Sequence, residues 1–191
     1  LVLGSKRSVR RDAGTALLGF AVLMAGMETM SGAVAPLAHS EAFAGILLLF
    51  TNPILGVLAG AALTAVIQSS SASVGILQAL SATGAVTNAV AIPIIMGQNI
   101  GTTVTALLSS VGTTRAARRA ALVHFYFNLL GTVVCLPVFW LIRDLAAPAI
   151  LGEGATPFSI AVFHSVFNVT CTSLLFPFRG KLEALAIRTI P

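Results

Sequence analysis

Polar side chains are concentrated within six consecutive residues of a segment that is otherwise apolar: Gln68, Ser69, Ser70, Ser71 and Ser73. Amide and hydroxyl oxygens are ligands for hard cations such as sodium, and amides and hydroxyls also donate hydrogen bonds to oxyanions. In an apolar environment each unsatisfied polar group costs several kcal/mol, so this cluster needs partners. One or two serines would suffice to hold helices together, whereas a cluster this dense favours a ligand site.

A second polar cluster lies in the middle of a long apolar block. Its members are Gly97, Gln98, Asn99, Gly101, Thr102 and Thr103. Two glycines four residues apart are typical of a close-packing face on an unbroken helix, but the amides between them and the threonines after them favour an unwound segment. An unwound segment at mid-membrane depth exposes carbonyls to a cation and a helix N-terminus to an anion. We therefore expect a broken helix here, with the two amides offering carbonyl oxygens and residues 101–103 offering backbone N–H groups.

The chemistry of the two clusters favours joint occupation by sodium and a small anion. Neither stretch contains a carboxylate, thiolate or imidazole, so transition metals would be poorly served, whereas neutral oxygens suit a hard cation. Hydroxyls and amides at helix ends also suit an oxyanion. These residues do not specify which anion. We find no nucleophile–base pair and no metal-binding constellation, so we do not expect an enzyme.

Three further features are candidates for accessory roles. A His-x-x-Phe-Asn pattern occurs twice, 40 residues apart, at His124/Asn128 and at His164/Asn168. Residues four apart share one helix face, so each pair serves either helix-to-helix hydrogen bonding or a proton or substrate role. Glu28 lies well inside an apolar run, where acids are costly and often functional; pairing with another helix and a cation or gating role are both open.

The segments that carry these residues predict an integral membrane protein. Hydrophobic residues make up 57% of the chain and charged residues 9%, and residues 42–114 contain no Asp, Glu, Lys, Arg or His. Apolar blocks at 13–36, 89–110, 120–142 and 158–178 are each long enough to span a bilayer. The block at 53–83 differs, because residues 68–71 divide it into two arms that are each too short to cross. It predicts a re-entrant helical hairpin.

The basic residues predict the orientation of the chain. They cluster at 6–11, 115–119 and 179–188, whereas the connections near 38–52 and 143–157 carry one basic residue, Arg143, against three acids. Basic clusters favour the cytoplasmic side. This predicts a cytoplasmic basic segment at 1–12, a transmembrane unit at 13–178 and a cytoplasmic segment at 179–191, in a multi-pass protein of the cell (inner) membrane. Orientation explains the net charge of +5, so we expect no nucleic-acid partner.

The motifs resemble those of the type II sodium/phosphate cotransporter family. The resemblance rests on two segments read together, Thr64-Ala65-Val66-Ile67-Gln68-Ser69-Ser70-Ser71-Ala72 and Gly97-Gln98-Asn99-Ile100-Gly101-Thr102-Thr103. It implies an all-α transporter that carries inorganic phosphate, with sodium as the coupling ion and no other cofactor. It places the serine motif, with Thr64 as an accessory residue, near the substrate and sodium.

The resemblance also implies that this chain holds one part of a larger assembly. Family members carry two inverted repeats, each with its own Gln-Ser-Ser-Ser, and this chain contains one copy, which looks like the second repeat. The other repeat is expected upstream or in another chain, and a cytosolic regulatory domain is a further expected partner. The alternatives are a non-transporting membrane scaffold and a component of a phosphate exporter.

Because the two clusters should reach similar membrane depth, we predict sodium contacts at Gln68, Ser69, Ser70 and Asn99.

Overall fold

The computed structural model describes residues 8–34, 36, 40, 42, 46 and 49–191, and this part of the chain is helical without a β-strand. The bounds are α1 Ser8–Val34, α3 Pro53–Ile67, α4 Ser70–Ser81, α5 Asn88–Ser110, α6 Arg115–Leu141, η2 Ile142–Ala146, α7 Ala149–Gly152, α8 Pro157–Leu175, η3 Phe176–Phe178 and α9 Arg179–Thr189. The all-α prediction is confirmed. The predicted basic segment at 1–12 lies partly outside the described residues.

Four helical segments are long and apolar enough to cross a membrane: Arg11–Met30, Asn88–Ser110, Arg115–Ala146 and Pro157–Thr189. They coincide with the four apolar blocks predicted to span, although α6 begins earlier than its apolar block because Thr114 caps its first turn. The chain is therefore a multi-pass membrane protein.

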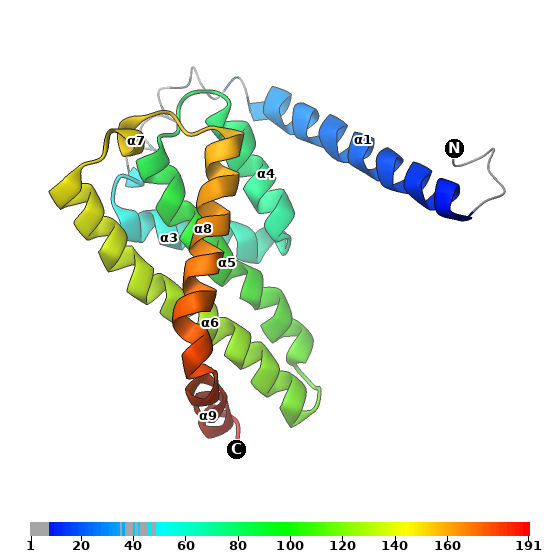
Figure 1. Ribbon diagram of the computed structural model, residues 1–191, viewed down its shortest axis with the longest axis vertical. Helices are drawn as coiled ribbons and strands as arrows, with labels where there is room; N and C mark the ends of the chain where they lie inside the picture. The colour runs from blue at the N-terminus through cyan, green and yellow to red at the C-terminus, as the bar shows by residue number, and fades with distance from the viewer. Residues whose placement is uncertain (1–7, 35, 37–39, 41, 43–45, 47–48) are drawn as a thin grey trace.

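Helix α5 is the centre of the bundle, and it contacts α3, α4, α6, α7 and α8 (Figure 1). Its contact with α3 is made at backbone level, because a side chain on either of two glycines would collide with the other helix. A Cβ on Gly97 would overlap the carbonyl of Val57, and one on Gly60 would overlap the carbonyl of Ile94. Small residues at such positions let two membrane helices approach closely, and here they bring the polar residues of α5 next to the hairpin.

The prediction of a broken helix at residues 97–103 is wrong, because α5 is continuous from Asn88 to Ser110. The glycine pair serves as the close-packing face that was the other interpretation. The polar side chains also need no unwound backbone, because they bond to carbonyls of their own helix: Asn99 Nδ2 donates to Ile95 O at 2.9 Å, and the Thr102 hydroxyl donates to Gln98 O at 2.8 Å. The N–H groups of residues 101–103 consequently belong to a helix interior and not to a helix N-terminus.

The segment predicted at 53–83 as a re-entrant hairpin consists of two helices with a break between them, α3 and α4. Its outer ends lie at one end of the bundle, next to the connection between α6 and α8. Before α3, the carbonyl of Thr51 accepts from Arg143 Nη1 at 3.1 Å, and after α4 the carbonyl of Val86 accepts from Ala155 N at 2.7 Å. The chain therefore enters and leaves the hairpin at the same end of the bundle.

Helix α1 stands away from the bundle along most of its length (Figure 1) and contacts it through α4. Most of its described side chains are exposed, including Leu17, Leu18 and Phe20. An exposed apolar helix of this length is suited to lipid or to another membrane segment.

Candidate ion-binding site

The break between α3 and α4 is formed by two residues with different backbone conformations. Gln68 ends α3 in the left-handed region, with φ 57° and ψ 22°, and its backbone N–H donates to Thr64 O. Ser69 is extended and caps α4, and its Oγ accepts from Ala72 N at 3.3 Å. A left-handed residue other than glycine costs about 1–2 kcal/mol. The presence of glutamine here, where glycine would fit without strain, points to a use for its exposed side chain.

The two helix ends at this break are electrostatically complementary to a cation and an anion. The carbonyls at the C-terminus of α3 carry partial negative charge, and the N–H groups at the N-terminus of α4 carry partial positive charge. Ser69 and Ser70 lie at this junction, half-buried, and Ser71 beside them is exposed. The Ser69 and Ser71 hydroxyls lie 3.4 Å apart. A helix break is thus present in the hairpin, where it brings both kinds of helix end to the serine motif.

One layer deeper, three side chains from α3, α4 and α5 form a buried hydrogen-bonded group, which we call the brace: Thr64, Ser73 and Gln98. The Thr64 hydroxyl donates to Ser73 Oγ at 2.7 Å, and Gln98 Nε2 donates to Ser73 Oγ at 2.9 Å and to Ser73 O at 3.0 Å. All three side chains are at most 1% exposed. The brace fixes both arms of the hairpin to α5. Gln98 Oε1 is buried without a hydrogen-bond partner among the described residues, so it remains a free acceptor.

A cleft of about 630 Å³ opens beside the serine motif, between α1, α4 and α8. Ser70, Ser71 and Gln78 line it from α4, and His164 lines it from α8. The α1 side consists of Leu23, Gly26, Met27 and Met30. Among the described residues of this lining, His164 is the one titratable side chain, and the other polar groups are the Ser70 and Ser71 hydroxyls and the Gln78 amide. Such a lining offers oxygen ligands to a hard cation and hydrogen-bond donors to an oxyanion.

His164 connects the cleft to the second polar cluster. Its Nε2 lies 3.4 Å from Oδ1 of Asn99 on α5, at the long end of hydrogen-bonding distance. The Asn99 amide nitrogen is held by Ile95 O, so its oxygen is directed to α8. The structure thus brings Asn99, His164 and the serine motif to one region through two neighbouring helices, and one of the two His-x-x-Phe-Asn histidines makes a helix-to-helix contact.

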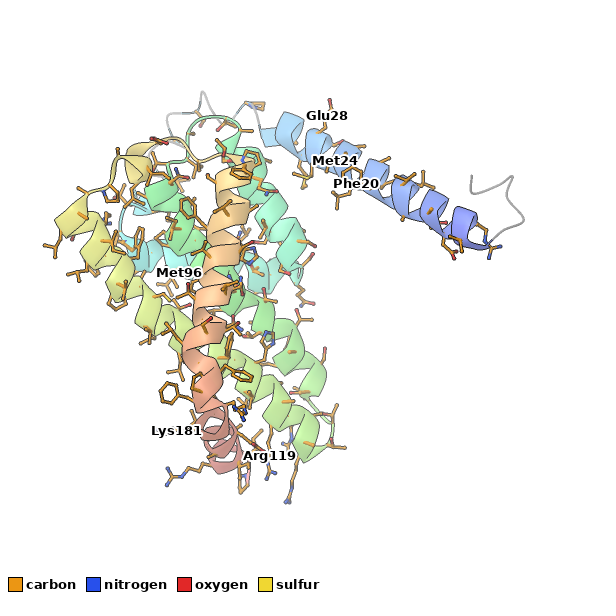
Figure 2. The ribbon with its side chains drawn as sticks, in the orientation of Figure 1. Phe20, Met24, Glu28, Met96, Arg119 and Lys181 are labelled. Atoms are coloured by element: carbon orange, nitrogen blue, oxygen red, sulfur yellow. The ribbon has the colours of Figure 1, made fainter. Side chains whose placement is uncertain are left out.

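The remaining predicted residues lie elsewhere or are engaged within their own helices. The Thr103 hydroxyl donates to Ile100 O, and the amides of Asn128 and Asn168 donate to the carbonyls of His124 and His164. His124 is exposed and lines a separate groove with Ser109 and Ser110. Glu28 is exposed on the face of α1 that points away from α4 (Figure 2). A direct role for these residues in ion binding stays a prediction.

No feature of the sequence singles out the α1 wall of the cleft. Leu23, Gly26, Met27 and Met30 have the i, i+3, i+4, i+7 spacing of one helix face, but that spacing is common to any apolar helix. Only the packing of α1 on α4 makes this face part of the site: Met30 Cε lies 3.0 Å from where a Cβ on Gly75 would be. Gln78 was missed for the same reason.

The fold and the site define a multi-pass helical membrane protein in which the break between α3 and α4 presents hydroxyl and amide groups beside a cleft. Residues 22–139 match the family described as Na+/Pi-cotransporter. The chain belongs to this family, which confirms the resemblance seen in its motifs. The family is a transporter family, and phosphate and sodium as transported ions are consistent with this membership.

Several curated proteins are similar to the chain. The Bacillus subtilis protein YqeW is 30% identical over 185 residues, which cover 95% of this chain and 58% of that protein. The Escherichia coli K12 protein named "Putative inorganic phosphate export protein YjbB" is 28% identical over 177 residues, 92% of this chain and 32% of the relative. Human "Sodium-dependent phosphate transport protein 2B" is 43% identical over 96 residues, 47% of this chain and 14% of the relative.

The chain thus spans less than two thirds of the length of each of these relatives. No solved structure shows a significant match to it.

Proposed function

We propose that this chain takes part in sodium-coupled transport of inorganic phosphate and supplies one of two inverted repeats. The observation that carries the proposal is the break at Gln68 and Ser69, where a helix C-terminus, a helix N-terminus and the serine hydroxyls meet beside an uncharged cleft. Family membership supports the identity of the ions. The second repeat would come from another part of the protein or from a partner chain, and a cytosolic regulatory domain is a further proposed partner.

Coupling to a cation follows from the charge of the substrate. Phosphate near neutral pH carries between one and two negative charges, and each opposes entry by about 2.3 kcal/mol per 100 mV of inside-negative potential. Accumulation therefore needs co-transported cations. The described cleft lining contains no carboxylate, so sodium itself would supply the positive charge that the site needs next to phosphate.

In this proposal the ions contact the serine motif, of which Ser70 and Ser71 line the cleft, and the residues beside it. Gln68, Ser69 and Ser70 would bind sodium together with Asn99 Oδ1, and Ser71 with the first N–H groups of α4 would bind the anion. The brace of Thr64, Ser73 and Gln98 would hold the site's geometry. Gln98 Oε1, its unpartnered acceptor, is the one brace atom placed to accept from a water or to contact a cation.

The re-entrant course of the hairpin is part of the proposal. The ends of the hairpin lie at the same end of the bundle, which supports entry and exit on one side of the membrane. Thr51 and Ala85 are both exposed, so single cysteines placed there should react with a membrane-impermeant thiol reagent from the same side, while both termini react from the cytoplasmic side. Labelling of the two positions from opposite sides would exclude a re-entrant hairpin.

The decisive experiment is labelled phosphate flux in vesicles that contain the complete protein. We expect uptake that requires an inward sodium gradient and does not occur with an equal potassium gradient. Uptake unaffected by sodium would rule out the coupling. Sodium-driven uptake by purified monomeric 1–191 would contradict the need for a second repeat.

Export is a second candidate, because a relative is named a phosphate export protein. Loading the vesicles with labelled phosphate tests it. Efflux without appreciable uptake under either sodium gradient would favour export.

A further inference from the structure

One end of the bundle carries most of the positive charge of the described chain. The N-terminus of α6 contributes Arg115, Arg118 and Arg119, and α9 contributes Arg179, Lys181 and Arg188, against the single acid Glu183. The two helices are joined there, because Arg119 Nε donates to Ile190 O at 2.9 Å and the Tyr126 and Thr189 hydroxyls lie 2.9 Å apart. Figure 2 shows Arg119 and Lys181 at this same end. The surface between α6 and α9 is therefore a fixed part of the fold.

A groove of about 500 Å³ lies on this surface and combines two kinds of lining. Leu130 and Val134, one turn apart in the apolar part of α6, line it together with Leu185 of α9. The cations Lys181 and Arg188 and the ring of Phe178 line it as well, and Lys181 Nζ lies 5.3 Å from the centre of that ring. The volume is in the range of small-ligand sites.

The two cations are not neutralised by acids of the described chain. The salt bridge among the described residues joins Arg143 and Asp144 at the other end of the bundle, and Glu183 lines a neighbouring groove with Arg179. Orientation in the membrane requires basic residues at this end, but it does not require an apolar groove directly beside them. A groove with apolar walls and two free cations is complementary to a ligand that is both anionic and apolar.

We propose that this groove binds one anionic phospholipid from the bilayer, with its phosphate between Lys181 and Arg188 and an acyl chain along Leu130 and Val134. Anionic lipids are concentrated at the cytoplasmic leaflet, and basic pockets between membrane helices are suited to their head groups. The lipid would join α6 to α9. This inference does not depend on the direction or the coupling of transport.

Native mass spectrometry of the complete protein, exchanged into mixed micelles with phosphatidylglycerol or phosphatidylcholine, tests the proposal. We expect one phosphatidylglycerol to be retained in preference to phosphatidylcholine. The double variant Lys181→Gln/Arg188→Gln should weaken its retention by about ten- to thirty-fold, since each basic residue near an anionic surface contributes about five-fold. Both side chains are exposed, so folding should survive.

The matched control is Arg143→Gln, which removes a cation from the opposite end and should leave retention unchanged. A second variant, Leu130→Trp, fills the apolar part of the groove and should reduce phosphatidylglycerol retention while the cations remain. Equal retention of the two lipids, or retention unaffected by the double variant, would overturn the proposal. So would release of the bound lipid by inorganic phosphate, which would show a site for the phosphate group alone, or a dimer that the double variant dissociates without any retained lipid.

Discussion

The hairpin apex at residues 68–71 and the polar part of α5 at residues 98–103 contain similar side chains in different surroundings. At the apex, Gln68 and Ser71 are exposed and two helix ends converge. In α5, Gln98 and Thr103 are buried and their donors are occupied by carbonyls and by Ser73. Amides and hydroxyls in a membrane are thus free to bind ions only where the fold does not use them. We expect substitutions at the apex to change ion affinity, and substitutions of the buried Gln98 and Thr103 in α5 to change stability.

Among the variants that test this comparison, Gly97→Leu should have the largest effect, a loss of stability. The new side chain would collide with the backbone of α3 at Val57, which would force α3 and α5 apart and cost about 3 kcal/mol or more. Gly19→Leu is the matched control, because no atom of the described residues lies within 4 Å of a Cβ at that position of α1. Thermal unfolding in detergent should show a large decrease in melting temperature for Gly97→Leu and no decrease for Gly19→Leu. Equal melting temperatures would mean that the close approach of α3 and α5 contributes little to stability.

Ser70→Ala and Asn99→Ala should reduce affinity without unfolding the protein. Loss of one hydrogen bond to a charged group costs about 1.5–3 kcal/mol, or on the order of ten- to a hundred-fold in affinity. Ser165→Ala is the control, since its exposed hydroxyl donates to Ala161 O on α8, outside the cleft lining. The measurement is the sodium and phosphate dependence of flux. Unaltered apparent affinities in both variants would remove Ser70 and Asn99 from the site.

Gln98→Leu sharpens the distinction between brace and ligand. It removes two hydrogen bonds to Ser73 and should destabilise the protein by about 1–3 kcal/mol, with ion affinity unchanged in the folded fraction. Gln78→Leu is the matched control for stability alone, because its amide makes one exposed bond, to Pro157 O at 3.1 Å, and should cost little on unfolding. If Gln98→Leu instead melted normally and lost sodium affinity, its unpartnered Oε1 would be an ion ligand.

Gln68→Gly should separate backbone from side chain at the break. Glycine adopts the left-handed conformation of Gln68 without strain, so the break should persist and stability should stay the same or rise by about 1 kcal/mol. If the amide contacts sodium, the sodium concentration that gives half-maximal flux must rise. Gln68→Ala, which keeps the strain, serves as the comparison. Normal sodium dependence in both variants would leave the left-handed glutamine without a role in binding.

The smallest effect is expected for the two histidines. His164→Gln weakens a single long contact to Asn99, so a two- to five-fold change in ion affinity is expected for a bond of about 0.5–1 kcal/mol. His124→Gln, in the same sequence pattern on α6, should leave affinity unchanged because His124 is remote from the cleft lining. Similar changes in ion affinity for both variants would show that the position of His164 beside the cleft does not explain its effect.

The sequence by itself determined the membrane character, the four long apolar helices and the division of residues 53–81 into two short helices. Each of these follows from local properties: the length of an apolar run, the absence of charge, and a polar interruption such as residues 68–71 between two arms. The family could also be identified from short motifs, because a few polar residues stand out where nearly all others are apolar.

Only the tertiary structure decided which polar residues are free. Gly97 and Gly101 with two amides between them fit both a packing face and an unwound segment, and the choice depended on α3, whose Val57 and Ala61 carbonyls fill the space above the two glycines. The pairing of Ser73 with Thr64 and Gln98, and the α1 wall of the cleft, likewise join residues far apart in the chain. Spacing within one helix gives the face on which a residue lies, but the partner of that face is set by helix packing.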